Sequence, residues 1–206
     1  ARWLNGLGLP AFVLRYRVAP YRHPYPLADV QRAVRYVRHH AREWGIDPDK
    51  IGVLGFSAGG HLTSSVGTHY DAGKADAEDP IERQSCRPNA IIPCYPVITM
   101  KPPYTHEGSL MNLLGEHPDP ALVESLSNET QVTPDTPPTF LWHTADDGAV
   151  PVENALLFAS ALSRNKVPFD LHIYESGRHG LGLAEEDPHV ANWTEACGLW
   201  LKRQGF

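Results

Sequence analysis

The sequence of 206 residues contains only three cysteines, Cys86, Cys94 and Cys197. An odd number without C-x-x-C spacing supports neither a disulfide framework nor a thiolate metal site, so we expect structural or free thiols. The eleven histidines form no pair with metal-ligand spacing. We therefore expect no metal and no other cofactor.

Long apolar runs and an excess of positive charge are also missing. The longest apolar runs, such as residues 90–95, have the length of a strand and fall far short of a membrane span. The net charge is −6, and the arginines are scattered or lie on one amphipathic helix, which argues against nucleic acid. The expected partners therefore include neither a membrane nor nucleic acid.

The chain has no internal repeat and no low-complexity tract. Its length fits one domain, residues 1–206, that buries roughly 70% of its unfolded surface. Residues 1–6 resemble the tail of a helix closed by glycine rather than a natural start. The lack of a signal peptide therefore says little about compartment, and the localisation stays unknown.

Short β-prone apolar runs alternate with segments of helical spacing. We expect buried strands at residues 11–16, 50–56, 90–95, 139–143 and 169–174, and helices at residues 27–44, 58–68, 151–165 and 188–203. Strands that alternate with helices imply a mostly parallel sheet with helices on both faces, because parallel strands need crossover connections. The predicted fold class is therefore α/β.

Residues 97–138 interrupt this alternation and are rich in proline and polar residues. We expect one short helix there, at 120–127. A stretch this long between two strands is either a lid over a site or an ordinary surface insertion, and both interpretations stay open.

The segment from Gly55 to Gly59 matches G-x-S-x-G and stands between a predicted strand and a predicted helix. In that context Ser57 sits on a tight turn that exposes its hydroxyl, and side chains on either glycine would collide with neighbouring elements. The following helix directs its free N–H groups at the same point. The Ala58 amide is therefore the predicted oxyanion donor, and Ser57 the predicted nucleophile.

A serine nucleophile needs a histidine that accepts its proton. His179 is the best candidate, because it lies in a glycine-flanked loop after the last predicted strand, where catalytic residues of open α/β sheets gather. His172 lies within a strand and His189 at a helix start. His61 and His69 lie on the helix after the nucleophile, so we interpret all four as structural.

The acid that orients the base is expected between Ser57 and His179, after a strand. Asp146 and Asp147 both satisfy this condition, because they follow the strand predicted at 139–143. One would accept the N–H of His179, and the other would cap a turn or the next helix. Physical reasoning from the sequence does not choose between them.

These motifs resemble the α/β-hydrolase superfamily. Within it, the chain is similar to the bacterial esterase and acetylesterase group related to carbohydrate acetyl esterases. The resembling segments are residues 47–62, 137–154 and 175–184, with Val18-Ala19-Pro20 before the first long helix. In that family the acid precedes a Val-Pro pair, here Val150-Pro151, by three and four residues. The resemblance therefore implies Asp147 as the acid.

The resemblance fails at one point. The family has a glycine-rich H-G-G-G-like turn that supplies a second oxyanion amide, and nothing in this sequence matches it. The resemblance implies that the sheet lacks the family's first strands, either because the chain is a fragment or because the protein is a shortened variant. An uncovered strand edge invites pairing, so we also expect copies of the chain to associate as a homo-oligomer.

The leading hypothesis is a serine esterase that hydrolyses small-molecule, short-chain carboxylic esters, among them acetyl esters of carbohydrates, through an acyl-enzyme. One alternative is a prolyl-oligopeptidase-like peptidase, which uses the same order of residues. Another is a catalytically dead α/β-hydrolase fragment that acts as a binding module. Tyr21, Tyr25, Tyr95 and Tyr104 are candidates for stacking on a sugar, or for ordinary packing.

Overall fold

The computed structural model describes residues 1–206 and contains one four-stranded sheet. The strands are β1 (Gly52–Phe56), β2 (Ala90–Cys94), β3 (Thr139–Thr144) and β4 (Phe169–Tyr174), and they lie in the order β1-β2-β3-β4. All three neighbouring pairs are parallel. The last four predicted strands and the α/β fold class are therefore confirmed.

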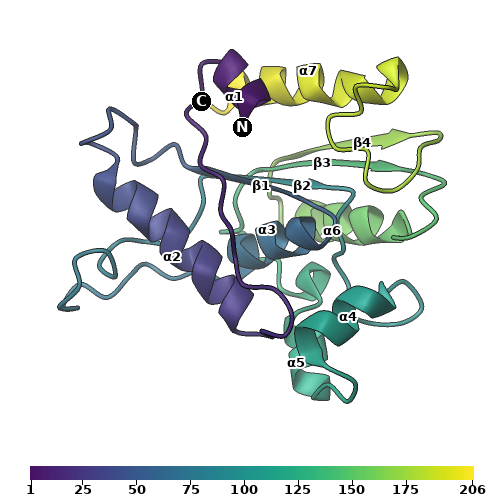
Figure 1. Cartoon of the computed structure of the whole chain (residues 1–206), viewed down its shortest axis with the longest axis horizontal. Helices are drawn as coiled ribbons and strands as arrows, with labels where there is room; N and C mark the ends of the chain where they lie inside the picture. The colour runs from purple at the N-terminus through teal and green to yellow at the C-terminus, as the bar shows by residue number, and fades with distance from the viewer.

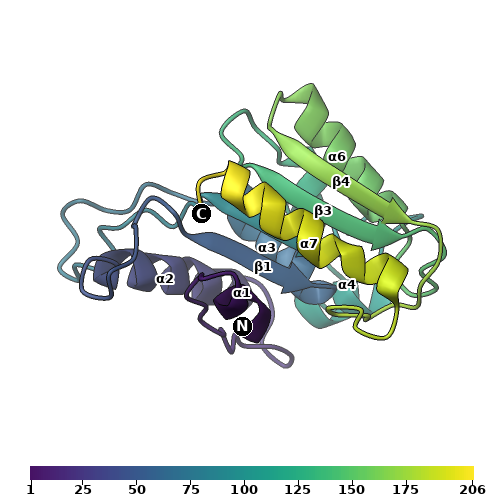
Figure 2. The same cartoon turned by 90° about the horizontal axis from the view of Figure 1, so that it is seen from above.

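Helices cover both faces of this sheet (Figures 1 and 2). One face carries α1 (Arg2–Gly6) and α7 (Pro188–Arg203), and the other carries α2 (Tyr25–His40), α3 (Ala58–Thr68) and α6 (Glu153–Arg164). The helix predicted at 27–44 ends four residues early. The others differ from prediction by two residues or fewer at each end.

Alternating side chains of the strands build two separate cores. Phe140 and Trp142 of β3 pack with Trp193 and other residues of α7. Leu141, between them, packs with residues of α6 such as Phe158. Every residue of β2 and β3 is buried, because helices cover both faces, which explains why these strands read as continuous apolar runs.

Side chains cap the starts of some helices, whereas α1, α2, α3 and α6 have no side-chain cap. At α7 the Asp187 side chain accepts from the amides of His189 and Val190, and Pro188 occupies the first turn, where no N–H is needed. At α4 (Glu107–Leu114) the capping acceptor is the His106 side chain, which accepts from Ser109 N.

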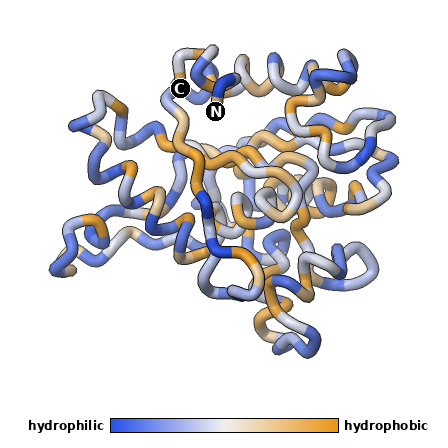
Figure 3. The backbone as a smooth tube through the Cα atoms, in the orientation of Figure 1, coloured by the Kyte–Doolittle hydropathy of each residue, from blue (hydrophilic) through white to orange (hydrophobic).

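The strand predicted at residues 11–16 is wrong. These residues form no strand and make no backbone hydrogen bond, and Phe12 and Val13 are 56% and 78% exposed. Figure 3 shows the apolar residues of this segment on the outside of the molecule. A strand is stable only when its backbone groups pair, and here β1 forms the sheet edge without pairing to this segment.

Residues 97–138 contain α4, α5 (Pro120–Ser125) and a 3₁₀ turn, Asn128–Thr130. The short helix predicted at 120–127 is confirmed, whereas α4 was not predicted. Asn154 of α6 holds the start of this stretch, because its buried side chain accepts from Ile98 N and Thr99 N and donates to Tyr104 O. The two interpretations of this stretch, a lid and an ordinary surface insertion, both remain predictions.

Candidate active site

The turn at Ser57 joins β1 to α3 and has a strained backbone. Ser57 has φ 56° and ψ −117°, which is unusual for a residue with a side chain. A Cβ on Gly55 would lie 2.1 Å from Gly59 O, so only glycine fits there. The expected collision at Gly59 is wrong, because a Cβ there would meet only the Tyr16 hydroxyl at 3.9 Å. The close approach falls instead at Gly60, whose Cβ would lie 2.6 Å from Pro96.

Three loops bring Ser57, His179 and Asp147 together. The loops follow β1, β4 and β3, so all three side chains come from the carboxyl ends of parallel strands in one sheet. His179 Nε2 lies 2.7 Å from Ser57 Oγ, and His179 Nδ1 lies 2.6 Å from Asp147 Oδ2. Because a carboxylate can only accept, Nδ1 carries the proton, and Nε2 is left to accept from the serine hydroxyl.

The two adjacent aspartates have different contacts. Asp147 has a fully buried side chain, and its Oδ1 accepts from Ala149 N at 2.9 Å and Val150 N at 3.0 Å, which leaves Oδ2 for His179. Asp146 is exposed and accepts from Ser176 Oγ at 2.6 Å and Gly177 N at 2.7 Å. The structure therefore brings Asp147 to the histidine, and Asp146 to the loop that carries the histidine.

The donors around Asp147 control its charge. Burial alone would raise the pKa of this carboxyl, but donors from His143, His179 and the amides of Val150 and Ala149 outweigh burial. Together they hold the pKa of Asp147 well below its usual value. The carboxylate is therefore ionised at neutral pH.

His143 is a residue near this site that the sequence reasoning missed. It is fully buried at the end of β3, with Nε2 3.0 Å from Val150 O and 3.3 Å from Asp147 Oδ2. A carbonyl only accepts, so Nε2 carries the proton and directs it toward both oxygens, while Nδ1 has no partner. The available signal was its position four residues before Asp147 at a strand end.

Tyr95 also packs against the His179 ring. Its ring lies edge-on to the imidazole at 5.1 Å, and its hydroxyl accepts from Gly182 N at 3.0 Å. Burial raises the pKa of Tyr95 to about 12, so the phenol stays neutral. Tyr95 is 5% exposed, which makes the sugar-stacking interpretation wrong for this tyrosine.

The Ala58 amide lies next to Ser57 at the first position of α3, and no protein acceptor takes its hydrogen bond. A free N–H at the positive end of a helix suits a developing oxyanion. The expected oxyanion donor is thus free to donate in the structure, and its role stays a prediction.

The side chains of the remaining candidate histidines contact groups other than Ser57. His172 stacks on Phe140 at 4.9 Å, and His189 lies edge-on to Tyr174 at 5.4 Å. His61 is buried and binds Leu126 O at 2.8 Å, and burial lowers its pKa to about 4. His69 lies 3.3 Å from Ser125 Oγ.

Other groups considered from the sequence also have definite positions. The three cysteines are buried free thiols, and burial raises the pKa of each. No group of three or more His, Cys, Asp or Glu side chains is arranged to hold a metal ion. None of the helices combines the length and apolar character that crossing a bilayer requires.

Two curated proteins illustrate the relatives of this chain. An endo-1,4-beta-xylanase B from Butyrivibrio fibrisolvens is 41% identical over 191 residues, which cover 91% of this chain and 30% of that protein. An acetylxylan esterase from Xylanibacter ruminicola is 36% identical over 204 residues, 97% of this chain and 40% of that protein. The chain thus spans less than half the length of either relative.

Solved structures show the same fold. An acetyl ester-xyloside bifunctional hydrolase from Caldicellulosiruptor lactoaceticus has a TM-score of 0.98 and 57% identity, covering all of this chain and 75% of its own. A carboxylesterase from Lactobacillus plantarum has a TM-score of 0.79 and 27% identity, covering 100% of this chain and 78% of its own. Residues 8–162 match the BD-FAE family. From this match and these relatives, the chain belongs to the BD-FAE family of α/β-hydrolases.

Proposed function

We propose that this chain hydrolyses carboxylic esters, with Ser57 as nucleophile, His179 as base and Asp147 as the acid that orients the base. The observation that carries the proposal is the unbroken series of hydrogen bonds, 2.7 Å from Ser57 to His179 and 2.6 Å from His179 to Asp147. The buried, ionised Asp147 supports the same assignment, because it stabilises the imidazolium that forms when Ser57 loses its proton.

The first half of the reaction transfers the acyl group to the enzyme. Ser57 Oγ attacks the carbonyl carbon and forms an Oγ–C bond, while its proton passes to His179 Nε2. The negative charge on the carbonyl oxygen is stabilised by the Ala58 amide. His179 then gives the proton to the alcohol oxygen as the C–O bond breaks, and the alcohol leaves.

The second half repeats these steps with water. His179 Nε2 takes a proton from the water, whose oxygen attacks the acyl carbon, and returns it to Ser57 Oγ as the acyl–serine bond breaks. One ester and one water yield one acid and one alcohol. The bond to Asp147 and the edge contact with Tyr95 keep the imidazole in place for both halves.

The names of the relatives support carbohydrate esters as substrates. One is an acetylxylan esterase, and one similar structure is an acetyl ester-xyloside hydrolase. On that basis acetyl esters of xylan-type sugars are the first candidates. Tyr21 and Tyr25 are exposed and lie edge-to-face at 5.7 Å, so they remain candidates for stacking on a sugar ring.

The decisive experiment combines covalent labelling with turnover. A fluorophosphonate probe should add once to the chain and not to Ser57→Ala, and hydrolysis of 4-nitrophenyl acetate should be lost in the same variant. Labelling at another serine would overturn the assignment of Ser57. An unlabelled and inactive chain would instead favour the binding module, and hydrolysis of prolyl peptide amides but not of esters would favour the peptidase.

A further inference from the structure

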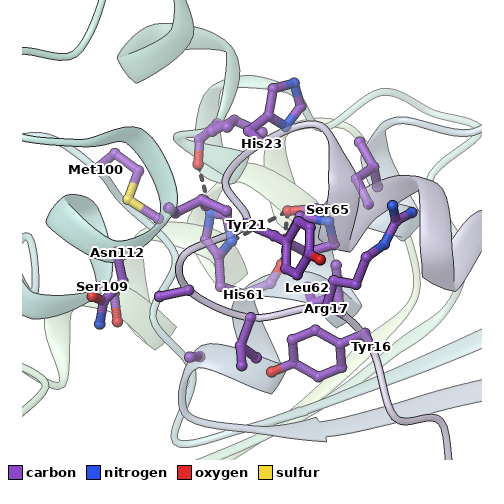
Figure 4. Close-up of a pocket in the computed structure, with 17 residues that line it drawn as sticks. Tyr16, Arg17, Tyr21, His23, His61, Leu62, Ser65, Met100, Ser109 and Asn112 are labelled. Carbon is purple, nitrogen blue, oxygen red and sulfur yellow. Dashed lines mark hydrogen bonds between the residues drawn. The ribbon is translucent and has the colours of Figure 1, made fainter.

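The turn at the end of β2, residues 94–97, contacts both the nucleophile and the loop of the base. An apolar cavity of about 300 Å³ opens beside the start of α3, and its lining includes His61 and Leu62 of that helix (Figure 4). No residue of the turn lines this cavity, and no residue of the base loop, 175–187, lines it either. What the turn contributes to the site must therefore come from its own contacts with the nucleophile and with that loop.

The backbone of the turn holds Ser57 at both of its polar groups. Cys94 O accepts from Ser57 N at 3.0 Å, and Val97 N donates to Ser57 O at 3.2 Å. Because backbone N–H and C=O groups are strong hydrogen-bonding groups, these two contacts fix where the strained backbone of Ser57 lies.

Tyr95 lies between these two contacts and reaches the base loop with its side chain. Its φ of 33° is unusual for a residue with a side chain, and such strain persists only where the surroundings fix it. Its amide donates to Trp142 O at 2.7 Å, and its ring packs edge-on against the Trp142 ring at 5.0 Å. In this conformation the ring meets the His179 imidazole at 5.1 Å, and the hydroxyl accepts from Gly182 N at 3.0 Å.

The loop of the base is anchored at two glycines. Gly177, two residues before the base, donates its N–H to Asp146 at 2.7 Å. Gly182, three residues after the base, donates its N–H to Tyr95, and its carbonyl accepts from Trp193 Nε1 at 3.2 Å. The backbone between the two glycines forms hydrogen bonds only within the loop. The position of the base therefore depends on both anchors.

We infer that Tyr95 is a positioning residue, which holds the loop of His179 against the turn of Ser57 and so keeps the base within reach of the nucleophile. The inference rests on the proposed function, since it takes Ser57 as nucleophile and His179 as base. One short segment then sets the position of both groups. Its backbone fixes the serine, and its tyrosine hydroxyl fixes the end of the base loop that Asp146 does not hold.

Tyr95→Phe tests this role, because it removes the hydroxyl and keeps the ring. A misplacement of reacting groups by about 1 Å can cost about 10²-fold in rate, and the loss of one of two anchors permits part of that misplacement. We therefore expect kcat on 4-nitrophenyl acetate to fall about tenfold. KM should stay within about twofold, because both halves of the reaction use the same histidine and slow together.

The rate and the extent of fluorophosphonate labelling separate positioning from folding. The rate reports how well His179 activates Ser57, whereas the extent at completion counts the folded sites. Tyr95→Phe should label about tenfold more slowly than the unchanged chain and still reach the same extent.

Tyr174→Phe is the matched control. Tyr174 packs against the same Trp142 ring, at 6.2 Å, but its hydroxyl forms no hydrogen bond within the protein. Removing this hydroxyl should leave both kcat and the labelling rate within about twofold of the unchanged chain, as surface-like changes without lost contacts do.

The outcomes separate this inference from the proposed function. If Tyr95→Phe keeps the labelling rate and kcat of the unchanged chain, the inference is overturned, and Ser57 and His179 remain nucleophile and base. Fewer labelled sites at an unchanged rate per site would also overturn it, because Tyr95 would then support only the fold. An unchanged chain that neither labels at Ser57 nor hydrolyses the ester would overturn the proposed function, and this inference with it.

Discussion

The two sides of Ser57 differ in how many hydrogen bonds and packing contacts the chain forms there. On the His179 side, the triad side chains are held by short hydrogen bonds and by the packed ring of Tyr95. On the Ala58 side, a free amide and an open apolar cavity adjoin an extended segment, residues 11–16, that pairs with nothing. The comparison teaches that the hydrogen bonds proposed for proton transfer are already formed within residues 1–206, whereas for the proposed oxyanion site these residues offer the free amide of Ala58.

The largest expected effect lies on the proton-transfer side. Asp147→Asn should lower kcat by about 10⁴-fold, because an amide favours the wrong tautomer of His179. Asp146→Asn should cost less than tenfold, since Asp146 contacts only the loop of the histidine. Steady-state kinetics on 4-nitrophenyl acetate provide the measurement. The reverse ranking would transfer the role to Asp146.

The next effect concerns the oxyanion side. Loss of one of two oxyanion donors typically costs 10²–10³-fold in rate, so we expect feeble turnover from residues 1–206 made alone. Joining an upstream segment that carries a glycine-rich turn should raise kcat at least tenfold. The control is the same segment with its turn glycines changed to proline, which lacks the N–H donor. Equal gains from both segments would show that the turn amides contribute nothing.

A smaller effect is expected at His143, which we propose as a positioning residue for Asp147. His143→Ala removes a donor from the Asp147 carboxylate, so kcat should fall about tenfold. The acid limb of the pH–rate profile should also move to higher pH, because the less neutralised carboxylate stabilises the imidazolium more. His143→Gln should restore both, since its amide can donate from a similar place. A loss of kcat without movement of the acid limb would indicate a purely structural role.

The charge of Asp147 should also contribute to stability. Its pKa is lowered in the folded chain, so the contribution is present above its unfolded pKa of about 3.9 and is lost as pH falls below that value. The free energy of unfolding of Asp147→Asn should be lower by on the order of 2 kcal/mol at pH 7. The difference in the free energy of unfolding between the unchanged chain and Asp147→Asn, measured by urea titration, should shrink as the pH falls below about 4. A difference independent of pH would contradict this account.

The smallest effect is expected in the unpaired segment. Exposed apolar residues beside an open sheet edge favour association of copies. Val13→Glu should shift the chain toward monomer in sedimentation at concentrations of tens of micromolar, about two- to fivefold in the association constant. Leu199→Glu, which changes an exposed residue of α7, is the control and should have no effect. A wild-type chain that is monomeric throughout would refute the prediction.

Predictions from the sequence were correct where a short stretch of sequence contains the physical cause of the structure. The turn at Ser57 needs glycine at position 55, and the buried strands β2 and β3 are continuous apolar runs, so both are visible in the sequence. The strand at 11–16 failed because β-propensity does not report whether a partner lies alongside. Helix α4 was missed because its N-cap is a histidine, which is uncommon at that position.

The site required information that a single sequence does not hold. The distinction between Asp146 and Asp147 came from a family resemblance, and its physical basis is the turn in which Asp147 accepts from Ala149 N and Val150 N. The contact of His143 with Asp147 depends on the same turn, which brings Val150 O back to the end of β3. Two predictions depend on contacts between surfaces that a sequence pattern does not show. They are the lid at residues 97–138 and the association of copies of the chain.

The bonds of Asp146 to Ser176 and Gly177 join the loop that carries the acid to the loop that carries the base. The two loops should therefore open as a unit, because separating them breaks these bonds together with the one between Asp147 and His179. Such opening leaves the core against α6 packed and disturbs the core against α7 only where the loop residues Leu181, Leu183 and Ala184 contact it. We therefore expect heat inactivation of this chain to begin as a local opening that precedes melting of the sheet, and activity should return on cooling from temperatures just below the unfolding transition.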